Sequence, residues 1–570
     1  MKTVMNAAAT PRLPLKTSFA ALLPLSLCLP LHAQVNQPAI PNAGSILQQV
    51  QPALPAAPQA NRPALQVQPD AAPGAPASAP FQVRAIRIVG NSAFTTDTLH
   101  ALIAGAEGRS VTLAELEQEA ARITAWYQQH GFSLSRAIVP AQTIREGAVV
   151  IQVVEARYGA VRLKNGSRVD DALLSATLGR LQPGRAIAER DLDRALLLLS
   201  DVPGVAVDAV IKPGAAVGAA DLEVAARRSP ATVASLVLDN AGNRYIGRAR
   251  LGANAYLINP LRHGDVFDAS IISTGHGMDY GRVGYETLLG GAGTRAGAAF
   301  SSVHYKLQDD VSVLDAYGRA GVASAWIKQP LLRGRESNLY LQGAYDAKRL
   351  RDRIGASDTR TDRRLDNWML SLSGDLRDGL LGGGVNPWSL GWTRGRTRFE
   401  DADAQAADAA SAQTRGRFSK WNANASRLQR LGARDALYLN LGAQWANSNL
   451  DSAEKMTVGG PFTVRAYDSG ALSGDTGYVA SVELRHELGS FAGSWQAIVF
   501  ADSARIRINR DAWSGAVNAA RLSGAGLGLT WSGPAAWRAS VSVATPIGAE
   551  PSLLGRQRST RAWATLGKGF

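Results

Sequence analysis

The C-terminal part of the chain, residues 229–570, is a long series of short segments in which hydrophobic and polar residues alternate. In Ala436–Trp445, leucines at every second position share one face with Trp445, and the other face carries polar residues and glycine. Gly477–Arg485 and Trp537–Ala544 alternate in the same way. A period of two with one polar face is typical of strands that line a membrane barrel with a wet lumen.

None of these segments is apolar enough to be a membrane helix, and a bilayer admits only helices or closed barrels. We count about sixteen candidate strands from Thr232 onward, and bacterial single-chain barrels contain an even number of strands. The sequence therefore predicts an all-β transmembrane barrel of antiparallel strands. A soluble β-sandwich or a solenoid would alternate too, but the N-terminus of the chain argues for export.

Residues 1–33 are typical of a secretory signal peptide, with a basic start, the apolar core Phe19–Leu31 and a cleavage site after Ala33. Cys28 is the one cysteine, and Leu27 before it is too bulky for a lipoprotein signal. Removal of the signal peptide would leave a chain without cysteine. Disulfides and thiolate metal sites are then excluded.

The chain is basic, and its net charge falls from +14 to +11 when Lys2, Arg12 and Lys16 leave with the signal peptide. Excess arginine is compatible with nucleic-acid binding. We favour arginines that line a barrel lumen or meet lipopolysaccharide phosphates outside it. The 57 glycines and 12 tryptophans suit a barrel, where glycine permits strand bends and tryptophan lies at the membrane interfaces.

Residues 34–80 form a proline-rich segment that holds only two charged residues, Arg62 and Asp70. Such a stretch cannot bury a core and should be an extended, partly polyproline linker. One part of it has helical character, because Ser45 can cap a helix over Ile46–Gln51. This helix is too short to be stable alone, so its apolar patch needs a surface on which to dock. The patch comprises Ile46, Leu47 and Val50.

Residues 81–156 predict a small unit with the order β-α-α-β-β, and residues 157–228 repeat that order. In the first unit, Thr112-x-x-Glu115 forms a capping box that starts a helix. Its apolar residues Leu116, Ala120, Ile123 and Tyr127 keep helical spacing. The pattern predicts two tandem α/β domains, although one larger α+β domain would also fit. The predicted elements are Val83–Val89, Asp97–Ala104, Arg136–Val139, Ala148–Val154, Ala160–Leu163, Asp170–Leu178, Glu189–Leu199, Val205–Ile211 and Leu222–Ala226.

Long polar segments between the barrel strands, Asp352–Asp366 and Glu400–Arg417, are expected to be extracellular loops. The second contains Glu400, Asp401 and Asp403, but their spacing matches no rigid calcium-binding loop. We therefore predict a solvated loop tip, no metal site and no cofactor.

The order of these parts resembles the outer-membrane transporters of two-partner secretion, the TpsB family, which are relatives of BamA. The small units would then be POTRA domains. The segment Asp239–Gly247, followed by Asn259-Pro260-Leu261 and Gly264-Asp265, is similar to the family's entry into the barrel. The strand that ends at Phe570 is similar to the signal read by the barrel-assembly machinery.

Two further stretches resemble paired motifs of this family. Val464-Arg465-Ala466-Tyr467 is similar to the Val-Arg-Gly-Tyr/Phe motif, carried at the tip of a loop near residues 451–476 that folds into the lumen. Phe500–Ala504 is similar to the Phe-x-Asp-x-Gly strand, whose aspartate, here Asp502, would pair with Arg465. The chain departs from the family at three positions, because Ala466 and Ala504 replace glycines and Lys568 shares a face with Phe570. Ala466 matters if its position requires a positive φ.

The resemblance implies a translocator that secretes a large unfolded partner protein, such as a haemolysin, an adhesin or a contact-inhibition toxin. The POTRA domains would lie in the periplasm and recognise that partner, and a helix over Ser45–Gln51 would plug the resting lumen. The other expected partners are the barrel-assembly machinery, periplasmic chaperones and outer-membrane lipid or lipopolysaccharide, and not nucleic acid. The main alternative is a BamA-like assembly factor, which generally carries more POTRA domains. A porin would not need residues 81–228, and an enzyme is disfavoured because the sequence contains no H-E-x-x-H, G-x-S-x-G or G-x-x-x-x-G-K-[ST] motif.

Overall fold

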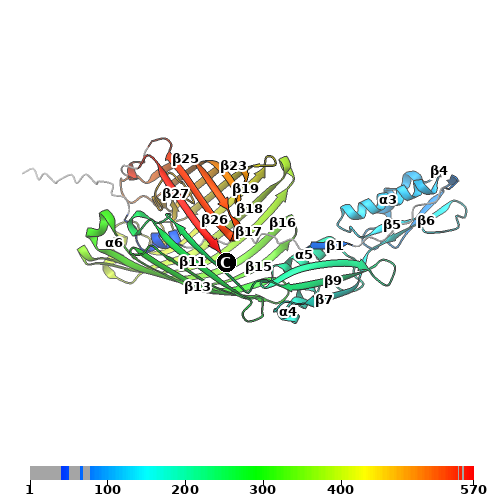
Figure 1. The fold of residues 1–570 in the computed structure, drawn as a ribbon, viewed down its shortest axis with the longest axis horizontal. Helices are drawn as coiled ribbons and strands as arrows, with labels where there is room; N and C mark the ends of the chain where they lie inside the picture. Colours follow the sequence, from blue (N-terminus) through cyan, green and yellow to red (C-terminus); the bar gives the residue numbers. More distant parts are fainter. Residues whose placement is uncertain (1–39, 51–63, 68–77, 550, 555–557) are drawn as a thin grey trace, which may run out of the picture. The chain divides into compact units, whose positions relative to one another are not determined.

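The computed structural model describes residues 40–50, 64–67, 78–549, 551–554 and 558–570. The predicted signal peptide and most of the proline-rich segment lie outside these residues. Two small α/β units precede a closed antiparallel barrel (Figure 1), so the predicted fold class is confirmed. Among the described residues, no helix combines the length and hydropathy needed to cross a bilayer.

The first small unit packs one long helix against a three-stranded sheet in the order β3-β6-β5. The helix α3 starts at the predicted capping box, in which Thr112 and Glu115 bond each other's backbone N–H groups. Its four predicted core residues are buried, at 2% exposure or less. The elements are β2 (Phe81–Gln82), β3 (Ala85–Val89), α2 (Thr96–Ala101), η1 (Ala104–Ala106), β4 (Ser110–Val111), α3 (Leu113–Gln129), β5 (Arg136–Ile138) and β6 (Ala148–Val154).

A buried carboxylate, Glu155, fixes the end of β6. It accepts hydrogen bonds from the backbone N–H groups of Ser92 and Ala93, from the hydroxyls of Ser92 and Tyr127, and from Arg157. Burial alone would raise the pKa of Glu155, but the hydrogen bonds from Ser92, Ala93 and Tyr127 outweigh burial and lower that pKa. The charged form of Glu155 therefore stabilises the native first unit.

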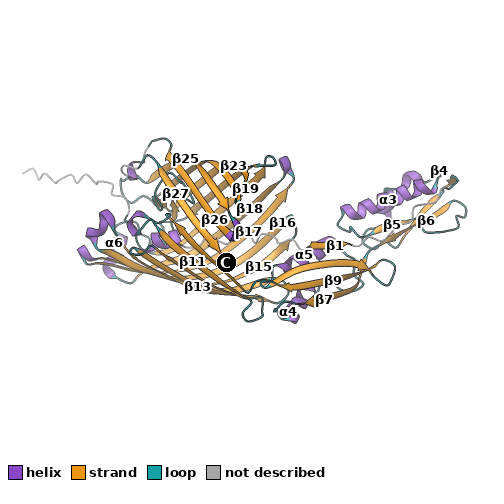
Figure 2. Cartoon of the chain, viewed as in Figure 1, coloured by secondary structure: helices purple, strands orange, loops and turns teal. Residues whose placement is uncertain are grey.

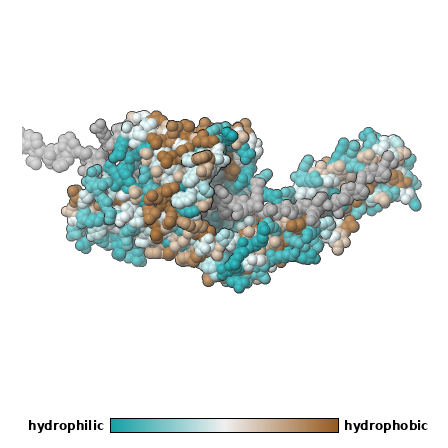
Figure 3. All heavy atoms as spheres, in the orientation of Figure 1, coloured by the Kyte–Doolittle hydropathy of each residue, from teal (hydrophilic) through white to brown (hydrophobic). Residues whose placement is uncertain are grey.

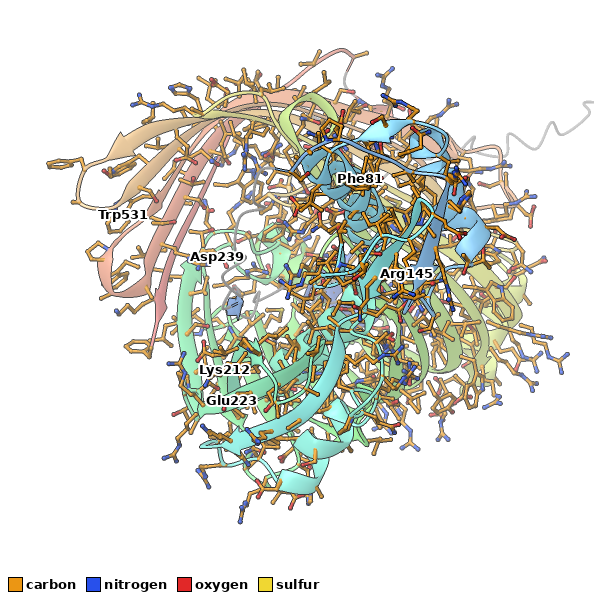
Figure 4. All side chains as sticks on the ribbon, turned by 90° about the vertical axis from the view of Figure 1, so that its right-hand side faces the viewer. Phe81, Arg145, Lys212, Glu223, Asp239 and Trp531 are labelled. Carbon is orange, nitrogen blue, oxygen red and sulfur yellow. The ribbon has the colours of Figure 1, made fainter. Side chains whose placement is uncertain are left out.

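The second small unit contains an unpredicted strand from the linker. Residues Ala64–Val67 form β1, which pairs in parallel with β8 and extends the sheet to the order β1-β8-β9-β7. The linker was expected to be extended, and Ala64–Val67 is extended, but its pairing was not predicted. The pairing follows because the open edge of β8 offers its N–H and C=O groups to an extended chain. Figure 4 shows Lys212 of β8 beside Glu223 of β9, an ion pair at 3.0 Å. The unit comprises β7 (Arg157–Asn165), α4 (Asp171–Leu178), α5 (Glu189–Ser200), β8 (Val205–Pro213) and β9 (Ala219–Arg228).

Sixteen antiparallel strands close the barrel, and β27 pairs with β10 to complete the ring. Figure 2 shows strands throughout the barrel wall. The strands are β10 (Thr232–Asp239), β11 (Arg250–Ile258), β12 (Val266–Ser273), β13 (Met278–Leu289), β14 (Thr294–Lys306), β15 (Ala316–Arg333), β16 (Ser337–Ile354), β17 (Thr359–Asp378), β18 (Gly384–Phe399), β19 (Gly416–Arg430), β20 (Asp435–Ala446), β23 (Thr476–Ser490), β24 (Ser494–Arg507), β25 (Ala519–Ser532), β26 (Trp537–Pro546) and β27 (Arg561–Gly569).

The barrel wall is apolar outside and polar inside, as the alternation predicts. Leu441 and Val499 face outward, at 49% and 54% exposure, whereas Gln444 faces inward at 2%. Figure 3 shows the resulting hydrophobic belt, with hydrophilic residues toward the end that carries α6 (Ala402–Ala409). This belt matches the hydrocarbon layer that a transmembrane barrel must face.

One predicted loop is wrong. Asp352–Asp366 is mostly strand, because β16 and β17 continue toward each other and leave only a short turn at η4 (Gly355–Ser357). Cross-strand ion pairs such as Arg353–Asp362 stabilise this polar hairpin, so its charged sequence does not imply a loop. The second predicted loop, Glu400–Arg417, does contain the connection between β18 and β19 and includes α6.

Candidate functional site

The segment between β20 and β23, residues 447–475, folds into the barrel as a small hairpin of β21 (Met456–Val458) and β22 (Leu472–Gly474). Gly459 and Gly460 after β21 take positive φ angles of 100° and 103°, which turn the chain toward the tip. At the tip, Val464, Ala466 and Tyr467 are buried, at 1% exposure or less. We call residues 447–475 the lumen loop.

The structure brings Arg465 of the lumen loop onto Asp502 of β24. The guanidinium donates Nε–H to Oδ2 at 2.8 Å and Nη2–H to Oδ1 at 2.7 Å, and the backbone N–H of Arg465 also reaches Oδ2. Such a two-pronged pair fixes direction as well as distance. Arg465 and Asp502 are therefore held in one relative orientation.

Arg465 makes three further contacts, of which the one to Phe500 was expected and those to Glu483 and Ser481 were not. Its Nη1–H donates to Glu483 at 2.8 Å, its Nη2–H donates to Ser481 at 3.0 Å, and its guanidinium stacks 3.4 Å from the centroid of Phe500. Ser481 and Glu483 stand on the polar face of β23, so their inward direction was predictable but their partner was not. Trp563 donates its indole N–H to the carbonyl of Arg465 at 2.7 Å, which ties the tip to β27 as well.

The two alanines that replace motif glycines fit the structure. Ala466 has no positive φ, so its methyl group carries no backbone strain at that position. The space for this methyl comes from Gly524 of β25, where an added Cβ would lie 2.4 Å from the Cβ of Ala466. Ala504 is buried in the same cluster at 1% exposure. The departures therefore leave the loop tip packed.

A short helix lies inside the barrel, but it begins earlier than predicted. The helix α1 spans Ala43–Val50, and Asn42 rather than Ser45 caps it. Asn42 Oδ1 accepts the N–H of Ser45, and Ser45 Oγ accepts the N–H of Asn42. Both residue types cap helices well, and the asparagine comes first in the chain.

The helix α1 packs its apolar side against the barrel wall and against the lumen loop. Ile46, Leu47 and Val50 join a buried cluster with side chains of β13–β17 and β19. The N–H of Ala43 donates to Asp352 of β16 at 2.7 Å, and Gln48 bonds the carbonyl of Ala453 in the lumen loop. The predicted apolar patch therefore docks on the inner side of the barrel wall.

Close approach between α1 and the lumen loop depends on Gly44. A Cβ at this position would lie 2.3 Å from Oγ of Ser452 and 2.6 Å from the backbone nitrogen of Ala453. Ser452 also donates its hydroxyl to Asn42 at 2.7 Å. Helix and loop therefore fit together as one packed element.

Buried ions attach the start of the lumen loop to the wall. Glu454 pairs with Lys348 of β16 at 2.7 Å and with Lys420 of β19 at 2.9 Å, and all three side chains are at most 10% exposed. Arg363 of β17 similarly bonds Asp451 at 2.7 Å. Buried charges of this kind are tolerated only when they are paired, so these contacts fix the loop base in position.

Beside α1, the lumen contains a cavity of about 1370 Å³. Wall residues of both charge signs line it, and Gln48 of α1, Phe462 of the lumen loop and Asp201 of the second small unit also contribute. Among the residues that the structure describes, no group of three His, Cys, Asp or Glu side chains is placed to hold a metal ion.

The last residue, Phe570, lies at the junction of β27 and β10. Its backbone exchanges hydrogen bonds with Ala234 of β10, and its ring is 69% exposed. The ammonium group of Lys568 reaches the carbonyl of Ala535 in the turn before β26. Lys568 thus turns its charge toward the polar edge of the wall.

A closed sixteen-stranded barrel with a folded-in loop, an internal helix and small α/β units before it defines an outer-membrane translocator of the POTRA–barrel class. The family model described as haemolysin secretion/activation protein ShlB/FhaC/HecB matches residues 218–531, and the model of the ShlB-type POTRA domain matches residues 81–156. The chain belongs to this family of two-partner secretion transporters of the outer membrane, in which the POTRA domains lie in the periplasm.

Known proteins that are similar to most of this chain agree with this assignment. The heme/hemopexin transporter protein HuxB of Haemophilus influenzae (strain 86-028NP) is 26% identical over 463 residues, which are 80% of this chain and 82% of HuxB. The outer membrane transporter CdiB of Dickeya dadantii (strain 3937) is 23% identical over 440 residues, 73% of each chain. The solved structure of CdiB from Escherichia coli shares the fold with a TM-score of 0.71, at 20% identity, over 88% of this chain and 93% of CdiB. The alternative of a BamA-like assembly factor is the weaker interpretation, since the matching family model describes secretion.

Proposed function

We propose that the described contacts hold the translocator in a closed resting state, and that Arg465 is the latch of that state. The observation that carries this proposal is the set of contacts from Arg465 to Asp502, Glu483 and Phe500, which joins the tip of the lumen loop to two wall strands. One guanidinium thereby links the tip to both strands. Its loss would free the tip while leaving the wall intact.

Helix α1 is the plug of this resting state in our proposal. It fills the lumen beside the lumen loop, and its apolar side is buried against the wall. An exported chain needs that space, so α1 must leave before transport. The eight-residue helix is too short to be stable alone. This instability lowers the free-energy cost of releasing it from the lumen.

The exported partner would be captured by the second small unit. Strand β8 already binds an extended segment, β1 of the linker, through backbone pairing. Backbone pairing tolerates sequence variation, and it suits an unfolded client. We infer that the client displaces β1 from β8, and that this exchange loosens the tether of the plug.

The client would be a large secreted protein of the haemolysin, adhesin or contact-inhibition type, or a heme-acquisition protein as the name of HuxB suggests. Folding of the client outside the cell would supply the energy, and we assign no catalytic step to the chain. The barrel-assembly machinery, periplasmic chaperones and outer-membrane lipids are the further partners we expect. In this assignment residues 1–33 are the signal peptide, 34–80 the plug and linker, 81–156 and 157–228 the POTRA domains and 229–570 the barrel.

The latch is tested by Arg465→Ala in cells that secrete the native client. We expect secretion to fall while the barrel still inserts and still shows a folded, faster-running band on unheated gels. Arg510→Ala is the matched control, because within residues 78–549 its side chain pairs with the exposed Asp511 alone. Full secretion by the Arg465 variant would remove the latch from the mechanism.

The capture site is tested by a photo-crosslinking residue placed at Val210 of β8. In resting cells we expect an internal crosslink to the linker, since Val210 is in register with Gln66. In secreting cells the client should replace the linker in the crosslinked product. A crosslink that stays internal during active secretion would place client capture elsewhere.

A further inference from the structure

The outer surface of the barrel carries a group of arginines on one side, at the ends of strands β15–β19 that lie away from the small units. All are exposed, whereas their sequence neighbours Ala320, Lys348, Thr393 and Phe418 are buried on the lumen side. The side chains therefore point away from the lumen. We call five of them the arginine patch: Arg319, Arg349, Arg394, Arg396 and Arg417.

The arginine patch lacks counter-charges in the described structure. Within residues 78–549, none of its five guanidinium groups forms an ion pair or a hydrogen bond with a carboxylate. The nearby carboxylates are already engaged, because Asp362, Asp366 and Glu400 pair with other arginines of the same strands. The five guanidinium groups of the patch thus have no carboxylate of their own, although Asp362 and Asp366 lie among the same strands.

The strand register brings like charges directly opposite each other. Arg349 stands opposite Arg364, and Arg364 stands opposite Arg398. Arg396 likewise stands opposite Arg417. Glu400 and Asp366 neutralise Arg364 and Arg398. Arg396 faces Asp366 on its other side, but that carboxylate is engaged by Arg398. Like charges in facing positions destabilise a sheet unless something neutralises them, so the pair of Arg396 and Arg417 indicates an anionic ligand.

Aromatic side chains fix the height of the patch relative to the membrane. Trp392 and Trp421 lie together on the outer surface of β18 and β19, with ring centroids 6.4 Å apart, and Trp368 on β17 is 67% exposed. Such residues mark the edge of the hydrocarbon layer. Arg394 follows Trp392 by two residues on the same face, about 7 Å further along the strand. The patch therefore begins at the level of the lipid headgroups.

We propose that the arginine patch is a binding site for a phosphorylated glycolipid of the outer leaflet, the lipid A part of lipopolysaccharide. Arginine forks bind phosphate oxygens through paired, charged hydrogen bonds. Five neighbouring strands span about 19 Å at the usual strand spacing, which suits a headgroup with two phosphates better than a phospholipid with one. The exported chain does not meet this surface, because the patch faces the membrane side of the wall.

The site is tested on the purified full-length chain in detergent micelles. The variant Arg349→Gln/Arg394→Gln/Arg396→Gln removes three charges of the patch. A matched control, Arg87→Gln/Arg145→Gln/Arg180→Gln, removes three exposed arginines from the small units, far from the patch in sequence. Titration of diphosphoryl lipid A, followed by native mass spectrometry and by thermal unfolding, measures the apparent affinity of each protein.

We expect the patch variant to bind diphosphoryl lipid A at least about tenfold more weakly than the parent chain, since each charged hydrogen bond contributes that order of affinity. The control variant should bind like the parent. Dephosphorylated lipid A should bind all three proteins weakly. The proposal is overturned if the patch variant retains full affinity while folded on gels, or if phosphatidylglycerol binds the parent as tightly as lipid A does.

Discussion

Two arcs of the barrel wall differ in strand length. Strands β15–β19 contain 15 to 20 residues each, whereas β26, β27 and β10–β12 contain 8 to 10. A tilted strand crosses a bilayer with about 9–11 residues. The short arc is therefore little more than a membrane span, while the long arc projects beyond the hydrocarbon layer. The long arc thus offers additional wall on which to mount other elements.

The long arc carries the contacts that hold the base of the lumen loop and α1, whereas the tip of the loop is held by β23 and β24. Strands of the long arc hold Glu454 and Asp451 of the lumen loop, and β15 and β16 receive the plug helix. The short arc contains the junction of β10 and β27, whose register runs only from Ser235–Gly569 to Asp239–Thr565. The difference indicates two roles. The long arc is rigid and positions the lumen loop and the plug helix, whereas the weakly joined short arc can change its shape.

The largest effect is expected where the long arc holds the lumen loop. Glu454→Gln would leave Lys348 and Lys420 buried without a counter-charge, which should cost about 3–5 kcal/mol. We expect a lower temperature for the loss of the folded gel band and greater protease sensitivity of the lumen loop. Asp511→Asn, an exposed carboxylate, is the control. An unchanged variant would show that the long arc does not anchor the loop.

A smaller effect is expected where the plug meets the lumen loop. In Gly44→Ala the added methyl would overlap Ser452 and Ala453, and overpacking of this kind costs about 1–3 kcal/mol. The plug should leave the lumen more often, so single-channel conductance in planar bilayers should rise. Gly105→Ala, where a Cβ meets nothing within 4 Å, should leave the conductance unchanged. Identical traces for both variants would mean that α1 tolerates the methyl without moving.

The short arc is tested by Asn240→Ala. Asn240 extends the junction beyond β10, because its amide donates to the carbonyl of Ala562 and accepts the N–H of Ala564. Loss of these two hydrogen bonds should cost about 1–2 kcal/mol and speed amide hydrogen exchange in β10 and β27. Asn424→Ala on β19 removes one long hydrogen bond of the long arc and should leave exchange there unchanged. Equal rates of amide hydrogen exchange in β10 and β16 of the parent chain would contradict the difference in stability between the two arcs.

The sequence predicts which segments are strands and which face of each strand points into the lumen, because both follow from a period of two. Asp502 was placed on the lumen face correctly, and Leu441 and Trp445 on the lipid face. Strand length was not predictable at Asp352–Asp366, where charged residues continue a strand beyond the membrane. Polar composition reports that a segment is in water, and cross-strand pairing decides whether it is a loop.

The candidate site was only partly predictable, because its contacts join residues far apart in sequence. The pairing of Arg465 with Asp502 came from a family resemblance, not from the residues alone. Glu454 gave no signal, since a glutamate in a loop is ordinarily solvated and only tertiary packing buries it between Lys348 and Lys420. The strand β1 was missed because a short segment pairs according to the free edge beside it rather than its own pattern.

The smallest expected effect concerns the last residues of the short arc. Lys568 bonds the carbonyl of Ala535 and lies 5.4 Å from the ring centroid of Phe570, both at the edge of the wall. Exposed contacts of this kind contribute less than about 1 kcal/mol, so Lys568→Ala should fold with nearly unchanged stability. Removal of a charge at the edge of the wall should not hinder insertion, and the fraction of assembled barrel should stay equal or rise slightly. A marked fall in assembly, measured by the folded gel band, would mean that the lysine and the turn at Ala535 hold the end of β27 in register, and the short arc would then be more rigid than its length implies.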